Sequence, residues 1–312
     1  NALGTYLNDN DDWLPGLNTS GYAATRLRFS DKSAFNDPGV PVQNYDWMTP
    51  LLSQSFDLPV QRAERFHYLL RERRCPSVYF NTTFYDNPAD KSDFDELSPW
   101  PGTSYLQAAW FQYCGMNQTK RVLGPYERVP QLSITMEHAN ESYSDQPIWE
   151  MVVEDYLPRI GQVGPPARKV FAADGTRYLP NQAQGEPLDM EIGIYSKAFG
   201  TFATAGAWWS GSVAYGVSSN SSTLYGTSVG QGSASNGLNL SLTYRHGAGQ
   251  RGSNPTSAQN NRGKINMLFF DGHVDAKSDN ASREVDYWYP RGAKVRSQGE
   301  GMTNVPDDYV VP

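Results

Sequence analysis

The segment GKINMLFFDGHVDAK, residues 263–277, predicts a β-hairpin near the C-terminal end of the chain. Ile265, Met267 and Phe269 alternate with other side chains, as in a strand that buries one face. Asp271-Gly272 follows them, and an Asp-Gly pair between two strands favours a type I′ turn, in which both turn positions have positive φ. The segment therefore predicts two antiparallel strands of a sheet.

Other apolar segments predict further strands of the same sheet. The segment ARKVFAADGTRYLP, residues 167–180, has the same form as the first, with Asp174-Gly175 at its predicted turn. Shorter segments at residues 77–84, 103–116 and 129–136 also favour strands. A mainly antiparallel sheet is the expected result.

Three segments have the apolar spacing of helices. Leu3, Tyr6 and Leu7 share one face of a helix over residues 1–8, and the polar residues 8–12 predict its end. The same spacing predicts helices over residues 58–74 and 146–160. We therefore predict an α+β fold with long loop insertions: residues 86–102 and 199–242 are expected to be loop or irregular, and residues 287–312 an extended tail.

Composition excludes some classes of function. The 312 residues carry a net charge of −7, which disfavours a nucleic-acid partner. Charged residues make up 19% and aromatic residues 13%, as is typical of a β-rich, extracellular type of surface. Cys75 and Cys114 form either one disulfide or two buried free thiols.

Several short motifs follow one another along the chain. The sequence begins with NALGTYLNDNDDWLPG, residues 1–16, and continues with a Cys-Pro-Ser step that starts at Cys75. A Ser-Tyr step lies at 104–105, a Lys-x-x-x-Ala-Asp segment at 169–174 and an Arg-His step at 245–246. The closing motif is Asp-Gly-His-Val, residues 271–274.

Together these motifs resemble a family of bacterial proteins with a prepilin-type N-terminal cleavage/methylation segment. The family's C-terminal His…Asp-Gly-His signature corresponds here to His246, Asp271, Gly272 and His273. Its members are pilin-like and related to type II pseudopilins. The gap between His246 and Asp271 is longer here than is usual for the family.

The resemblance implies a pilin-like fold, in which an N-terminal helix packs on the sheet. It also implies a long apolar helix upstream of Asn1, absent from this sequence, that would reach the inner membrane. Four regions are expected: the helix end and polar turn (1–16), an α+β head (17–198), a Gly/Ser/aromatic-rich insertion (199–262), and a hairpin with an extended tail (263–312).

Two sets of residues suggest metal ligands. The oxygen-rich side chains of Asp9, Asn10, Asp11 and Asp12 suit calcium, and pseudopilin-type proteins often hold calcium in a loop, although a polar helix stop explains the same residues. His246, Asp271 and His273 suit a divalent ion, although a turn at Asp271-Gly272 explains that part of the set.

The resemblance predicts a structural subunit of a pilus-like or pseudopilus-like filament, which is extracellular or periplasmic in a Gram-negative type of bacterium. Its partners would be copies of itself or related subunits. The alternative is a secreted module that binds a glycan or polymer. Candidate interaction residues are Trp208, Trp209, Tyr215 and Tyr225, which suit stacking on sugars or on a neighbouring subunit, although packing in a core explains them equally. No nucleophile–base set stands out, so no enzymatic activity and no organic cofactor are predicted.

Overall fold

The computed structural model describes fifteen parts of the chain. They are residues 2–17, 19–20, 35–43, 45–78, 81–82, 91–113, 115, 155–175, 202–204, 222–223, 242–243, 245–247, 263–282, 284–295 and 309–312. The structural statements below concern these residues.

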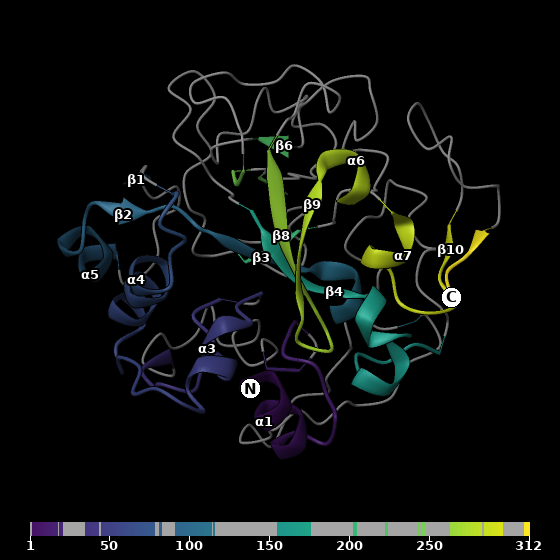
Figure 1. Ribbon diagram of the computed structural model, residues 1–312. Helices are drawn as coiled ribbons and strands as arrows, with labels where there is room; N and C mark the ends of the chain where they lie inside the picture. Colours follow the sequence, from purple (N-terminus) through teal and green to yellow (C-terminus); the bar gives the residue numbers. More distant parts are fainter. Residues whose placement is uncertain are drawn as a thin grey trace, which may run out of the picture.

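A five-stranded sheet forms the centre of the molecule, and it is mainly antiparallel (Figure 1). Its strands, in spatial order, are β5 (Ala203–Thr204), β3 (Tyr105–Ala108), β4 (Val170–Asp174), β8 (Lys264–Phe269) and β9 (Val274–Ser278). The β3–β4, β4–β8 and β8–β9 pairs are antiparallel, whereas β3 and β5 run parallel. The α+β prediction is therefore confirmed.

Burial along the strands follows their place in the sheet. Every residue of β4, the middle strand, is buried. In β8 burial alternates, with Ile265, Met267 and Phe269 inside, as the hairpin pattern predicted. The edge strand β9 is the most exposed, and its residues alternate between exposed and half-buried.

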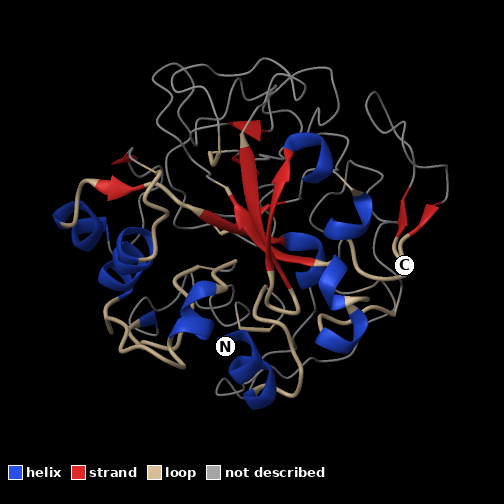
Figure 2. Cartoon of the chain, in the orientation of Figure 1, coloured by secondary structure: helices blue, strands red, loops and turns tan. Residues whose placement is uncertain are grey.

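Short helices surround this sheet (Figure 2). They are α1 (Ala2–Asp9), α3 (Met48–Leu52), α4 (Arg62–Glu72), α5 (Lys91–Glu96), α6 (Asp279–Ser282) and α7 (Val285–Trp288). In Figure 1, α4 and α5 lie on one side of the sheet and α6 and α7 on the other. None of the helices in the described parts is long and apolar enough to span a membrane.

The remaining elements are brief. Three 3-10 turns are described: η2 (Ala109–Gln112), η5 (Ile160–Gln162) and η6 (Pro166–Arg168). Three two-stranded ladders lie outside the central sheet: β1 (Asn81–Thr82) with β2 (Trp100–Pro101), β6 (Ser222–Thr223) with β7 (Leu242–Thr243), and β10 (Lys294–Val295) with β11 (Tyr309–Val310).

Aromatic side chains make up much of the core. Phe66 of α4 is fully buried and contacts the rings of Phe94, Trp100 and Phe202 with centroid separations of 5.4–6.3 Å. These partners come from α5, β2 and the segment that leads into β5. One helix of the first third of the chain is thereby packed against residues far away in sequence.

Two helix predictions are confirmed. The helix expected over 1–8 is α1, which buries Tyr6 and Leu7. The helix expected over 58–74 is α4, which buries Ala63, Phe66, Leu69 and Leu70. In both cases the apolar stripe of the sequence faces the core.

The loop predicted over 86–102 is wrong. Helix α5 and strand β2 both lie in that range. The polar composition concealed Phe94, which is fully buried and stacks on Trp100 at a centroid distance of 5.2 Å. The local preference for helix is weak here, and packing of this one aromatic ring stabilises the helix nevertheless.

Three further predictions are wrong in part. The strand predicted over 103–116 ends at Ala108 and continues as the 3-10 turn η2. The helix predicted over 146–160 does not include 155–159, where Trp13 bridges Arg159 and Leu14 donates to the carbonyl of Pro158. The predicted extended tail, residues 287–312, contains the end of α7 and the β10–β11 ladder, and Val311 after that ladder is buried. The strand predicted over 129–136 lies outside the described residues.

The two predicted Asp-Gly hairpins have different outcomes. The β8–β9 hairpin is present, but residues 270–273 connect its strands, and only Gly272 has positive φ, +92°. The expected type I′ turn is therefore replaced by a longer loop. Asp174 ends β4, and Gly175 continues into a bridge with Leu242 instead of turning. Pairing of β4 with β3 on one side and β8 on the other keeps this segment extended.

Candidate functional site

Three side chains with metal-binding or nucleophilic chemistry meet at one end of the central sheet. Nε2 of His246 lies 3.0 Å from Oδ2 of Asp174 and 3.9 Å from Sγ of Cys75. One ligand atom from each residue lies within 4.8 Å of the other two. Cys75 and Asp174 are buried, whereas the side chain of His246 is 28% exposed.

Separate elements fix each member of the Cys75–Asp174–His246 cluster. Cys75 follows α4, and its backbone N–H donates to Oγ of Ser104 at 2.9 Å. Asp174 is paired with Tyr105 of β3, and its Oδ2 accepts a 2.7 Å hydrogen bond from the backbone N–H of Asn266. The backbones of strands β3 and β8 therefore hold the carboxylate in place.

His246 is held by the first residue of β8. Its backbone N–H donates to the carbonyl of Lys264 at 3.1 Å, and the N–H of Lys264 donates back at 2.7 Å. This isolated antiparallel bridge adds a further backbone segment to the edge of the site.

Two more polar side chains surround the cluster. Burial lowers the pKa of Arg245, while the nearby Asp174 and Cys75 oppose that shift. Burial also raises the pKa of Tyr105 to about 12, and Cys75 and Asp174 add to this effect. Charges in such a poorly hydrated place interact strongly.

The geometry does not match a Cys–His–Asp catalytic triad. In a triad the imidazole faces the nucleophile with one ring nitrogen and the carboxylate with the other. Here the same atom, Nε2 of His246, faces both Cys75 and Asp174. The three side chains converge on one point, an arrangement suited to binding rather than to proton relay.

Residues from four of the quoted motifs meet at this site, although the Asp-Gly-His part of the closing motif does not. Cys75 belongs to the Cys-Pro-Ser step, Tyr105 to the Ser-Tyr step, Asp174 to the Lys-x-x-x-Ala-Asp segment, and Arg245 and His246 to the Arg-His step. Each motif was visible in the sequence, but their contact was not. The sequence feature that these motifs share is a titratable side chain in each, and this feature could have marked them as candidates for one site.

The Asp-Gly-His motif lies elsewhere, so the ligand set His246, Asp271 and His273 is wrong. His246 pairs with Lys264 at one end of β8, whereas Asp271 follows the other end. A strand of this length separates them by roughly 17 Å. His273 instead pairs with Asp271 at 2.6 Å and stacks on Phe269, and both members of the pair are exposed.

The oxygen-rich turn after α1 acts as a helix stop. Nδ2 of Asn10 donates to the carbonyl of Tyr6 at 2.7 Å, and the N–H of Asp12 donates to the carbonyl of Leu7 at 2.9 Å. Asp11 and Asp12 have φ of 49° and 65°, which an Asp adopts more readily than most residues. Calcium binding by Asp9 to Asp12 stays a prediction.

The predictions for the two cysteines and the four aromatic residues are tested only at Cys75. Cys75 is a buried free thiol, as in the second of the two alternatives above. Cys114 lies outside the described residues, as do the aromatic candidates Trp208, Trp209, Tyr215 and Tyr225.

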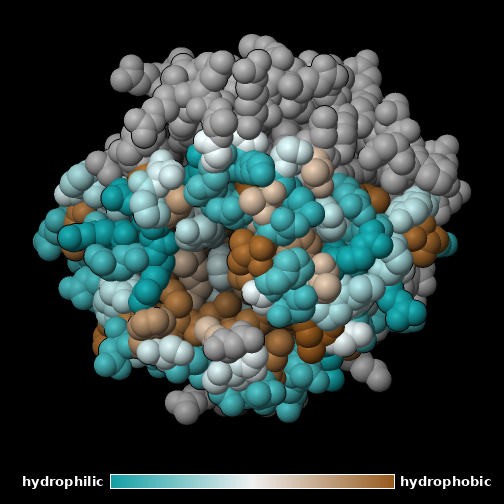
Figure 3. Space-filling view, in the orientation of Figure 1, coloured by the Kyte–Doolittle hydropathy of each residue, from teal (hydrophilic) through white to brown (hydrophobic). Residues whose placement is uncertain are grey.

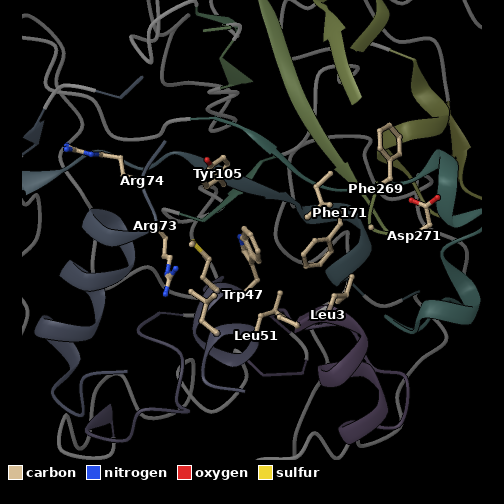
Figure 4. A pocket seen from close by; sticks show the side chains of 14 residues that line it. Leu3, Trp47, Leu51, Arg73, Arg74, Tyr105, Phe171, Phe269 and Asp271 are labelled. Atoms are coloured by element: carbon tan, nitrogen blue, oxygen red, sulfur yellow. The ribbon is translucent and has the colours of Figure 1, made fainter. Parts of the chain in front are cut away.

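A large apolar cavity shares Tyr105 with the surroundings of the cluster, but none of the three cluster residues lines it. It has a volume of about 720 Å³, and its lining includes Trp47, Phe171 and Phe269 (Figure 4). Figure 3 shows hydrophobic surface inside a hollow on this face of the molecule. Arg73 and Asp271 are charged residues of the lining. The sequence did not predict this cavity, because its wall comes from α1, α3, the two residues after α4, β3, β4 and the β8–β9 hairpin.

Lys169, from the same motif as Asp174, gives a pH-dependent prediction. Its Nζ donates to the backbone carbonyl of Asp286 at 2.9 Å, and burial lowers its pKa to about 8. The pKa in the unfolded chain is about 10.4, so the unfolded chain binds more protons between these values. The unfolding free energy therefore rises with pH there, by at most about 1.4 kcal/mol per pH unit.

We expect Lys169→Met to remove this rise, measured by urea unfolding at several pH values between about 7.5 and 9.5. Lys294→Met, at an exposed position, is the matched control and should keep the wild-type slope. The range ends below about pH 10 because Tyr6, whose pKa is raised to about 12 by burial, then shifts stability in the opposite direction. Equal slopes for Lys169→Met and wild type would contradict the prediction.

Comparison of the chain with protein-family models, curated proteins and solved structures finds no match.

Proposed function

We propose that this chain is the head of a pilin-like or pseudopilin-like subunit that assembles without covalent bonds into a filament. The observation that carries the proposal is the meeting of four motifs at the Cys75–Asp174–His246 cluster. Motifs that resemble a family only by chance have no reason to converge in space. We take their convergence as support for the resemblance that the sequence motifs suggest.

The packing of α1 also supports the proposal. Tyr6 and Leu7 are buried, and Leu3 packs against the same core. A helix of this length is not stable alone in water, so α1 depends on the body of the domain. This is the relationship that a pilin-like head has with the end of its assembly helix.

In the proposed filament, a longer helix that leads into α1 anchors the subunit in the inner membrane before assembly. Copies of this subunit or related pilin-like subunits then contact one another through these helices and through their heads. The filament is extracellular or periplasmic, and the subunit carries out no chemical reaction. Calcium at Asp9 to Asp12 would stiffen the turn between helix and head.

The test is electron microscopy of the natural, full-length product in its own host. We expect filaments that bind an antibody raised against this chain, and we expect them to disappear when the gene is deleted and return when it is restored. A matched strain that carries His273→Ala tests whether the exposed signature histidine is needed for assembly. Recovery of the full-length product only as a dispersed monomer would contradict the proposal.

The dispersed-monomer outcome would favour the alternative, a soluble ligand-binding module. The cavity of about 720 Å³ is the observation in its favour, because its size is typical of small-molecule sites. A glycan would have to use other surfaces, since apolar side chains such as Trp47, Leu51 and Phe171 line much of this cavity.

A further inference from the structure

We propose that Cys75, Asp174 and His246 bind one divalent transition-metal ion of the zinc class. This site is distinct from the turn at Asp9 to Asp12, where calcium is a prediction, and from Asp271 to His273 of the β8–β9 hairpin. The proposal does not depend on the filament role, because it rests on the geometry and chemistry of the cluster alone.

The distances suit a tetrahedral ion. Zinc bonds to sulfur, nitrogen and oxygen are about 2.0–2.3 Å long, which places neighbouring ligand atoms of a tetrahedron about 3.3–3.6 Å apart. The Nε2–Oδ2 distance of 3.0 Å and the Sγ–Nε2 distance of 3.9 Å bracket these values. Small side-chain rotations therefore suffice to close the site around an ion.

A buried oxygen without a partner points to the same ligand. Asp174 is fully buried, and among the described residues its Oδ1 has no hydrogen-bond partner. Its Oδ2, in contrast, accepts from the N–H of Asn266 and lies next to His246. Leaving a buried carboxylate oxygen unsatisfied is costly, and a cation bound by both oxygens of the Asp174 carboxylate removes that cost.

The ligand types select the class of metal. A thiolate with an imidazole and a carboxylate suits zinc and its transition-metal neighbours, whereas calcium and magnesium prefer oxygen ligands alone. A Cys75 thiolate and the Asp174 carboxylate carry two negative charges, which one divalent ion balances.

Three protein ligands leave a fourth position for water or another group. His246 provides the route for entry because its side chain is 28% exposed. A bound ion would link the segment after α4, the end of β4 and the bridge at Lys264. The metal would thus hold together three segments that are distant in sequence.

Cobalt(II) titration of the chelator-treated 312-residue chain under reducing conditions tests the proposal. We expect one equivalent to bind and to produce the near-ultraviolet absorption of a thiolate–cobalt bond, which zinc then removes by displacement. Cys75→Ser should abolish this absorption. His246→Ala should weaken cobalt binding by more than the roughly 10- to 100-fold that loss of an outer-sphere partner costs.

The controls separate this site from others. The chain has two cysteines, so Cys114→Ser must keep the absorption if Cys75 is the sulfur ligand. His273→Ala, at an exposed position, must also keep it. If a ligand variant does not fold, alkylation of Cys75 in the Cys114→Ser background gives a second readout, and zinc should slow it. A folded wild-type chain without cobalt absorption, or a Cys75→Ser variant that retains it, overturns the proposal.

Discussion

Replacing Asp174 by alanine is expected to lower the unfolding free energy by about 3–5 kcal/mol, the usual cost of removing one partner of a buried charge pair. Arg245 is buried beside Asp174, and the carboxylate also accepts the N–H of Asn266 and contacts His246. The variant leaves the guanidinium without its nearby carboxylate. Most domains are stable by about 5–15 kcal/mol, so this loss is a large part of the total.

Urea unfolding of wild type and Asp174→Ala, with a chelator present in both, measures this effect without a contribution from metal. The matched control is Asp271→Ala, which breaks an exposed, solvent-screened pair with His273 and should cost far less than Asp174→Ala. Replacing Asp174 and Arg245 together by apolar residues should restore part of the loss. Equal stabilities for Asp174→Ala and Asp271→Ala would show that the buried pair contributes little.

The second large effect is expected for Phe66→Ala, which should lower the unfolding free energy by about 3–5 kcal/mol. The Phe66 ring is fully buried among Phe94, Trp100 and Phe202, so its removal leaves a cavity that rigid aromatic neighbours fill poorly. It also removes edge-to-face ring contacts, each worth about 0.5–1.5 kcal/mol.

Thermal and urea unfolding of Phe66→Ala measure this loss, and Phe66→Leu serves as the milder variant that refills part of the cavity. Val60→Ala is the control, because Val60 is exposed and its loss should change stability by less than about 0.5 kcal/mol. If Phe66→Ala were as stable as Val60→Ala, helix α4 would not be packed as described.

Elements with local signals were predicted well from the sequence. The β8–β9 hairpin has strict alternation of Ile265, Met267 and Phe269 next to an Asp-Gly loop, and these signals lie within fifteen residues. Helix α4 carries a full apolar stripe over its eleven residues. In both cases the pattern that decides the local structure also decides which face is buried.

Elements that depend on distant partners were not predictable. Asp174-Gly175 has the same local signal as Asp271-Gly272, but β3 and β8 pair with β4 and keep it extended. Helix α5 has one buried aromatic residue, Phe94, and its partner Trp100 lies in another element. Tertiary packing therefore reversed the local preference at both places.

In the candidate site, too, the local motifs were visible in the sequence and the long-range contacts between them were not. Cys75, Asp174 and His246 each stood in a quoted motif, but nothing in the spacing of those motifs implied a common point in space. Their contact requires the antiparallel register of β3, β4 and β8 and the bridge from His246 to Lys264. This register depends on pairing across long intervals of sequence, which a single sequence does not reveal.

The order of strands in the central sheet has a consequence for how quickly the chain folds. The β8–β9 hairpin is local, and such hairpins form in about 1–10 μs. The other pairings join Tyr105 to Asp174 and Val170 to Phe269, so long loops must close before these contacts contribute. Sheets whose strands pair across such long intervals of sequence fold in milliseconds to seconds. The β8–β9 hairpin therefore forms long before β8 pairs with β4.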